Sequence, residues 1–135
     1  MNIQELSKLY KEYKLTKEDV FKHKHYVIIT RSGIEKIQNK ANINIKFEVV
    51  EASKEFCIVK ATGTYKMKEI ETFGSALYGT KSQNESGKWV DNGTTQSWYV
   101  MEIAEKRAMS RIVLKLTGFY EHNHFGEDES DDFKK

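Results

Sequence analysis

Basic residues recur at regular spacing in the segment 98–120, whose apolar residues have the periodicity of an amphipathic helix. Three cations lie four residues apart and a fourth precedes the first: Arg107, Arg111, Lys115 and Lys106. Like charges at this spacing repel one another by roughly 0.2–0.5 kcal/mol per pair. The acids Glu102 and Glu105 lie in the first turns, where the helix dipole favours them, and the later turns are left cationic. The row is typical of a face that binds a polyanion, or of a solvated basic face near a helix C-terminus.

The histidines form two His-x-His pairs, His23/His25 and His122/His124. Alternate residues of a strand point the same way, so each pair could offer two imidazoles to a metal ion. Two such pairs close in space would make a tetrahedral site. Surface histidines near the ends of elements are the simpler interpretation.

Other residue types with catalytic potential have no supporting motif. Four strand carboxylates could gather around a divalent cation, although solvated strand faces explain them more simply: Glu48, Glu51, Glu69 and Glu71. The chain has no Gly-x-x-x-x-Gly-Lys-Ser/Thr phosphate loop, and Ser75 lacks the second glycine of a nucleophile elbow. The single cysteine, Cys57, lies in an apolar run and is expected in the core. We therefore assign no catalytic residue, no metal site and no cofactor.

Charge is unevenly distributed along the chain. The net charge is +2 over 135 residues, but the end of the chain, GEDESDDFKK, is acidic, so the rest is moderately basic. A basic body with an acidic end fits a nucleic-acid binder. No apolar run is long enough to span a membrane, the N-terminus lacks a secretory signal, and one cysteine fits a reducing compartment. We expect a cytoplasmic protein with no membrane partner.

Four segments are predicted to be helical. Residues 3–14 form the first, and Thr16 begins a short second one because Asp19 lies at capping-box spacing. A turn at 31–33 leads into the third, over 34–41. The fourth spans 98–117 and ends at Gly118. Its apolar stripe, which should pack on a sheet, consists of Ala104, Ala108, Ile112 and Leu116.

The remaining segments predict strands and one long loop. Strands are expected over 25–30, 43–50, 55–67 and 69–79, and the second of them alternates as a half-buried antiparallel strand does. A polar loop of about 17 residues follows, a length that often indicates a functional segment. We predict an α+β domain: an antiparallel β-meander with a helix between the first and second strands and a long C-terminal helix packed on the sheet. Its parts are an N-terminal helical segment (1–24), a core (25–120) and a flexible acidic tail (121–135).

This order of elements resembles the DNA-binding core of the single-strand annealing proteins of the Rad fifty-two type, which include phage relatives. The likeness covers residues 25–120 and begins with a strand that ends in Tyr-Val-Ile-Ile-Thr-Arg. Its most specific part is 104–119, with Ala-Glu-Lys-Arg-Ala near the start of the helix and Thr-Gly-Phe at its end.

The resemblance implies a ring or helical filament of many subunits. Single-stranded DNA would lie in a positively charged groove between the β-meander and the helical part, with its phosphates against the protein and its bases free to pair. No nucleotide would be hydrolysed. Besides single-stranded DNA and further copies of the chain, the expected partners are a phage exonuclease or a host replication protein.

The family's basic positions fall on Lys106 and Arg107 in the long helix and on Arg31 beside the first strand. Counted from Gly118, Arg111 takes the helix position instead, so all three helix residues remain candidates. The further DNA-contacting candidates are Lys60, Lys81, Lys88, Lys115 and Tyr78. Trp89, Trp98 and Tyr78 could stack on bases, although Trp98 is better explained as a core residue and Tyr78 fits both interpretations.

Two other functions fit the sequence. A metal-dependent nuclease or other DNA-processing enzyme would use the histidine pairs or the strand carboxylates. A monomeric α+β adaptor would use neither. The annealing protein must form a large oligomer and bind DNA in the presence of a chelator, whereas a chelator would abolish the activity of the nuclease.

Overall fold

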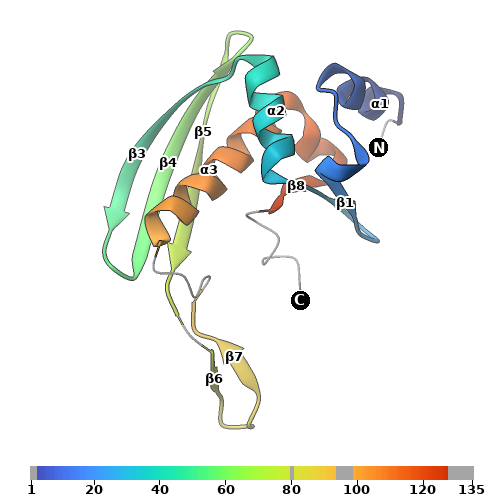
Figure 1. The fold of residues 1–135 in the computed structure, drawn as a ribbon. Helices are drawn as coiled ribbons and strands as arrows, with labels where there is room; N and C mark the ends of the chain where they lie inside the picture. Colours follow the sequence, from blue (N-terminus) through green and yellow to red (C-terminus); the bar gives the residue numbers. More distant parts are fainter. Residues whose placement is uncertain (1–2, 80, 94–98, 128–135) are drawn as a thin grey trace.

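The computed structural model describes residues 3–79, 81–93 and 99–127 of the chain. Helices α1 (Ile3–Glu12), α2 (Arg31–Ala41) and α3 (Val100–Thr117) combine with two sheets and a separate hairpin (Figure 1). The predicted α+β class is confirmed, including the antiparallel meander and the long helix packed on it. No described helix is long and apolar enough to cross a membrane.

The main sheet is the predicted meander, with strand order β3 (Asn44–Ala52), β4 (Phe56–Tyr65) and β5 (Lys68–Leu77). One face packs on α3 through small residues, among them Ala61 of β4 and Gly74 of β5. A Cβ atom at Gly74 would collide with the carbonyl oxygen of Ala104, so the helix backbone lies directly on this strand. Cys57 is buried on the same face, as expected of a core residue.

Strand β3 is only partly covered. Phe47 pairs with Ala61 and Val49 with Val59, which places both on the helix-facing side of the sheet. Their side chains nevertheless remain 41% and 49% exposed, because α3 lies over β4 and β5. The prediction of a half-buried strand is therefore wrong over Phe47–Val49. A β-bulge between Val49 and Glu51 bends the strand further along.

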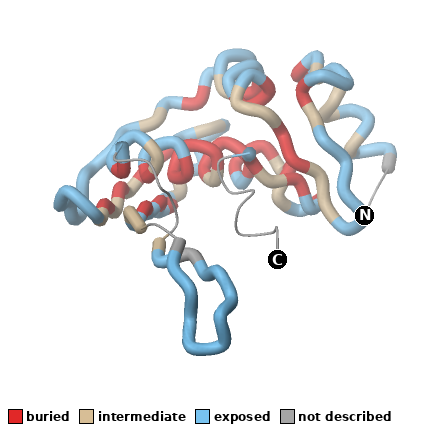
Figure 2. Tube along the Cα trace, turned by 60° about the horizontal axis from the view of Figure 1, so that its bottom comes forward, coloured by how far each residue is buried: buried red, intermediate tan, exposed pale blue. Residues whose placement is uncertain are grey.

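Helix α3 is buried on two sides and not on one stripe. Ala104, Ala108, Ile112 and Leu116 are buried as predicted, but so are Ser110, Val113 and Leu114. The second side is covered by α2 and by a small sheet of order β1 (Val20–Lys22), β2 (Val27–Ile29) and β8 (His124–Gly126). Figure 2 shows the buried residues concentrated in the middle of the molecule, between these layers. The sequence revealed only one of the two surfaces against which the helix packs.

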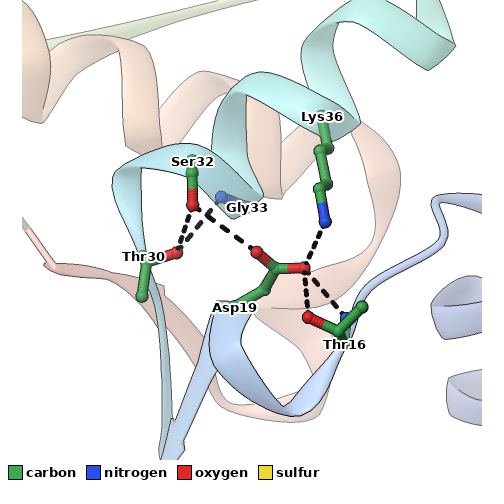
Figure 3. A network of polar contacts seen from close by, with 6 residues as sticks. All are labelled: Thr16, Asp19, Thr30, Ser32, Gly33 and Lys36. Carbon is green, nitrogen blue, oxygen red and sulfur yellow. Dashed lines mark hydrogen bonds and ion pairs between the residues drawn. The ribbon is translucent and has the colours of Figure 1, made fainter.

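Asp19 ties the short 3-10 helix η1 (Lys17–Asp19) to α2 (Figure 3). Its carboxylate accepts hydrogen bonds from the Thr16 backbone N–H at 2.9 Å and from Lys36 Nζ at 2.7 Å. The first bond is the reciprocal half of the predicted capping box. Helix α2 begins at Arg31 and not at 34, because Thr30 accepts a hydrogen bond from the Gly33 N–H and acts as N-cap.

Several predicted boundaries change. The polar loop contains a hairpin of β6 (Lys81–Gln83) and β7 (Trp89–Asp91), which projects away from the body (Figure 1). Helix α3 begins at Val100 and ends at Thr117, and Gly118, with a φ of 92°, is the left-handed cap expected of glycine. Residues 121–127, assigned to the tail, instead complete η2 (Phe119–His122) and form β8. Trp98 and residues 128–135 lie outside the described residues.

Candidate nucleic-acid interface

The basic row of α3 divides into side chains with different surroundings. Arg107 is only 5% exposed, so the expectation that it lies on a solvated stripe is wrong. The sequence pattern did not reveal this burial. Lys106 and Lys115 are exposed. They are nine positions apart, which is about half a turn around the helix axis, so one bound strand could not follow both along a single face.

Arg111 lies at the outer edge of β5. Its Nη1 donates a 2.7 Å hydrogen bond to the carbonyl oxygen of Phe73. Strand β5 is the last in its sheet, and no described strand pairs with this outer edge. Arg111 therefore satisfies an edge carbonyl while its guanidinium remains partly accessible, which both fixes the side chain and places a positive charge beside the sheet.

Lys115 continues this arrangement one turn further along α3. The rise between Arg111 and Lys115 is about 6 Å along the axis. The Lys115 Nζ atom lies 5.4 Å from the centre of the Tyr120 ring, a cation–π contact that positions the ammonium group without neutralising it. Lys115 therefore lies further along α3 from the β6–β7 hairpin than Arg111 does.

The β6–β7 hairpin extends β5 at the other end. Lys88 is exposed, and the Trp89 side chain is 67% exposed. An exposed tryptophan beside a lysine is suited to stack on a base and to contact its phosphate. Lys81 lies in β6, but its side chain is outside the described residues. Tyr78, at the junction, is half-buried against the core cluster of Cys57, Val59, Ala76, Val100 and Ala104.

Two sequence candidates are engaged with acids. Lys60 lies on the open face of the main sheet, 2.9 Å from Glu48 and 3.8 Å from Glu71, and hydrogen bonding to Glu48 is the main cause of its raised pKa. Arg31 pairs with Glu35 at 3.4 Å, and its backbone N–H donates to the Glu127 carboxylate. Two of the four strand carboxylates, Glu48 and Glu71, thus lie around an ammonium group, and among the described residues no cluster of three or more potential ligands could hold a metal ion.

The histidine pairs do come together in space. His23, His25, His122 and His124 all line one cavity, together with Lys22 at the end of β1 and Lys24 of the β1–β2 turn among others. The recurrence of two His-x-His pairs was the sequence signal for this cavity, but sequence reasoning assigned no role to the neighbouring lysines.

Comparison with known proteins gave no match to any family model, curated protein or solved structure.

Proposed function

We propose that the protein is an oligomeric single-stranded DNA-binding protein that promotes the annealing of complementary strands without ATP. The supporting observation is a succession of side chains along one edge of the main sheet. We call this set, namely Lys115, Arg111, Lys88 and Trp89, the β5-edge strip. Arg111 hydrogen-bonds to the strand itself, Lys115 lies one turn further along α3, and the β6–β7 hairpin that carries the other two projects beyond the end of β5 (Figure 1).

The strip has the chemistry of a sequence-independent site. Lysine and arginine neutralise phosphates, and an exposed tryptophan offers a surface on which any base can stack. Arg111 is held by its hydrogen bond to Phe73, so its guanidinium does not have to be ordered when a strand binds. The proposal omits Lys60, whose charge is balanced by two carboxylates, and Arg107, which is buried.

Self-assembly is the second part of the proposal. The outer edge of β3 has no strand partner among the described residues, and Phe47, Val49 and Val50 are exposed along it. Unpaired edges with apolar side chains are surfaces that a neighbouring copy can cover. Light scattering should give a mass that is a multiple of 15.8 kDa. A monomer at every concentration, with and without DNA, would rule out the ring or filament.

The binding site is tested with a fluorescent single-stranded oligonucleotide in a chelator at several salt concentrations. Lys115→Ala and Lys88→Ala should each reduce the slope of log affinity against log salt by about 0.7, and Trp89→Ala should weaken binding by about 1–3 kcal/mol. Lys54→Ala, at an exposed lysine of the β3–β4 turn, is the matched control and should change neither quantity.

Lys106→Ala distinguishes between the DNA contact that the family resemblance implies and the contacts that we propose for the β5-edge strip. The resemblance places a DNA contact at Lys106, whereas the β5-edge strip leaves it on the opposite side of α3 from Lys115. A loss of affinity with Lys106→Ala and none with Lys115→Ala would favour the family register and reject the strip. Activity that depends on a divalent metal would instead support the alternative nuclease.

A further inference from the structure

A cavity of about 390 Å³ lies between α1, the β1–β2 turn and the junction of η2 with β8. These elements lie together at the end of the molecule that carries the small sheet (Figure 1). The lining comes from Leu6, Ser7, Tyr10, residues 22–27 and residues 122–124. No member of the β5-edge strip contributes to it, so the cavity is a separate feature of the protein.

The lining is cationic. Lys22, His23, Lys24 and His25 are consecutive and all reach the cavity, whereas no aspartate or glutamate is among its described lining residues. Consecutive lysines and histidines without an acidic neighbour attract anions, and lysine is a common ligand of phosphate. The expected ligand therefore carries a negative charge.

One wall is fixed by an internal hydrogen-bond chain. The Tyr10 hydroxyl lies 2.7 Å from Nε2 of His124, and Nδ1 of His124 lies 2.8 Å from the carbonyl oxygen of His122. Since a carbonyl only accepts, Nδ1 carries the hydrogen and the Tyr10 hydroxyl donates to Nε2. Both ring nitrogens of His124 are thus occupied. Burial also lowers the pKa of His124, so this wall is built from a neutral ring and contributes no ligand contact.

His122 differs from His124. Its side chain is 6% exposed, and its Nδ1 atom is buried without a hydrogen-bond partner among the described residues. An unpaired buried polar atom costs about 1–3 kcal/mol, and such atoms are rare in folded proteins. His122 is one of the residues that line the cavity, and a bound molecule could supply the missing partner once the ring turns Nδ1 towards it.

The cavity also has aromatic surfaces. The His23 and Tyr26 rings are stacked, with their centres 4.6 Å apart and an interplanar angle of 17°, and Tyr10 lies on the opposite, α1 side of the lining. The volume is within the lower range of small-molecule sites and too small for a polymer to enter. A ligand of matching size would combine one anionic group with one planar ring.

We propose that this cavity binds a nucleoside monophosphate, either as a free nucleotide or as the 5′-phosphorylated end of a DNA strand. The phosphate would contact Lys22 and Lys24, and the base would lie against the aromatic lining. His122 would hydrogen-bond the ligand through Nδ1. The proposal does not depend on strand binding at the β5-edge strip.

Calorimetric titration of the full chain with adenosine 5′-monophosphate tests this site. The nucleotide should bind, and adenosine and inorganic phosphate should each bind at least tenfold more weakly. Lys22→Ala and Lys24→Ala should each weaken nucleotide binding by about tenfold, whereas Lys54→Ala and Lys115→Ala should not change it. Absence of nucleotide binding, equal affinity for inorganic phosphate, or unchanged affinity in both lysine variants would overturn the proposal.

A spectroscopic measurement on the unmodified protein tests the site even if a variant fails to fold. In imidazole ¹H–¹⁵N spectra of the unmodified protein, the nucleotide should shift the ring signals of His122 more than those of His124. The reverse order would contradict the assignment of the ligand contact.

Oligonucleotides with and without a 5′-phosphate distinguish the two ligand sources. Tighter binding of the phosphorylated strand, lost in Lys24→Ala, identifies the strand end as the ligand. Nucleotide binding without any preference between the strands identifies the free nucleotide.

Discussion

Lys60, on the open face of the main sheet, and the lysines at the cavity differ in whether nearby acids balance their charge. Lys60 lies between Glu48 and Glu71, so its charge is balanced by the protein itself. Lys22 and Lys24 line a cavity to which no described acid contributes. In one region the charge of the cation is balanced by acids on neighbouring strands, and in the other the cations are available to a ligand.

The difference follows from strand register. The antiparallel pairing of β3 with β4 places Glu48 directly opposite Lys60, and Glu71 lies diagonally across from it on β5. Opposite charges at such positions attract each other across a sheet. Lys22, the last residue of β1, lies opposite the apolar Val27 of β2, and Lys24 lies in the turn that follows, so neither faces an acid across a strand pair. The function of a lysine therefore depends on neighbours that a sequence pattern does not reveal.

The largest effect on the free energy of unfolding is expected at the ion pair between Lys36 and Asp19, where the charge of the lysine is again balanced by an acid. Removing its partner in Asp19→Ala should lower the free energy of unfolding by about 3 kcal/mol, because a capping bond and a charge-assisted bond are lost together. Urea denaturation measures this, with the exposed neighbour in Glu18→Ala as control. Equal losses in the two variants would show that the Asp19 network does not stabilise the fold.

Arg107→Ala should destabilise the protein by about 2 kcal/mol, because a buried side chain with a long apolar stem is removed. Lys115→Ala should cost less than about 0.5 kcal/mol, since its side chain is exposed. Thermal and urea unfolding compare the two variants. If Arg107→Ala were as stable as the unmodified protein and bound DNA poorly, the division of α3 into structural and ligand-binding cations would be wrong.

A pH effect is expected from His124. Its pKa is lowered by burial from the ordinary value of 6.5, so the unfolded chain takes up this proton at a higher pH than the folded chain does. The free energy of unfolding should therefore fall as the pH drops below 6.5, by up to about 1.4 kcal/mol per pH unit.

Urea denaturation between neutral and acidic pH measures this slope. His124→Phe should flatten it, whereas His25→Gln, at an exposed histidine, should leave it unchanged. A slope that survives in His124→Phe would assign the titration to another group.

The smallest effect on the free energy of unfolding is expected for a substitution of Lys60. Lys60→Met should leave the free energy of unfolding nearly unchanged, because exposed ion pairs contribute little. Its strand affinity should fall by less than that of Lys115→Ala, although the substitution removes the same charge. Anisotropy titrations with single-stranded DNA at one salt concentration measure both affinities. Equal losses of affinity in the two variants would show that ion pairing with acids does not determine whether a lysine can bind DNA.

Local features of the fold were predictable from the sequence. The capping box at Thr16 and Asp19, the end of α3 at Gly118 and the strands of the meander depend on residues close in the chain. Each has a local cause, such as a side chain within reach of a backbone amide or a glycine that tolerates positive φ.

The features that the sequence did not reveal depend on distant contacts. The second packing surface of α3 requires α2 and β8, and the burial of Arg107 is likewise not local, whereas periodicity reports only that a residue is apolar and regularly spaced. The exposure of Phe47 depends on which strands the helix covers. The spacing of the histidines that line the cavity can be seen in the sequence, but the position of the cavity depends on the pairing between β2 and β8.

The parallel pairing of β8 with β2 also determines the order in which this chain can fold during synthesis. Strand β2 lies between β1 and β8, so one of its edges stays unpaired until residues 124–126 have left the ribosome. A nascent chain therefore presents Val27, Ile28 and Ile29 as an open edge while the intervening meander is still being made. Such high contact order slows the final step of folding and prolongs the time during which chaperones or other nascent chains can bind that edge.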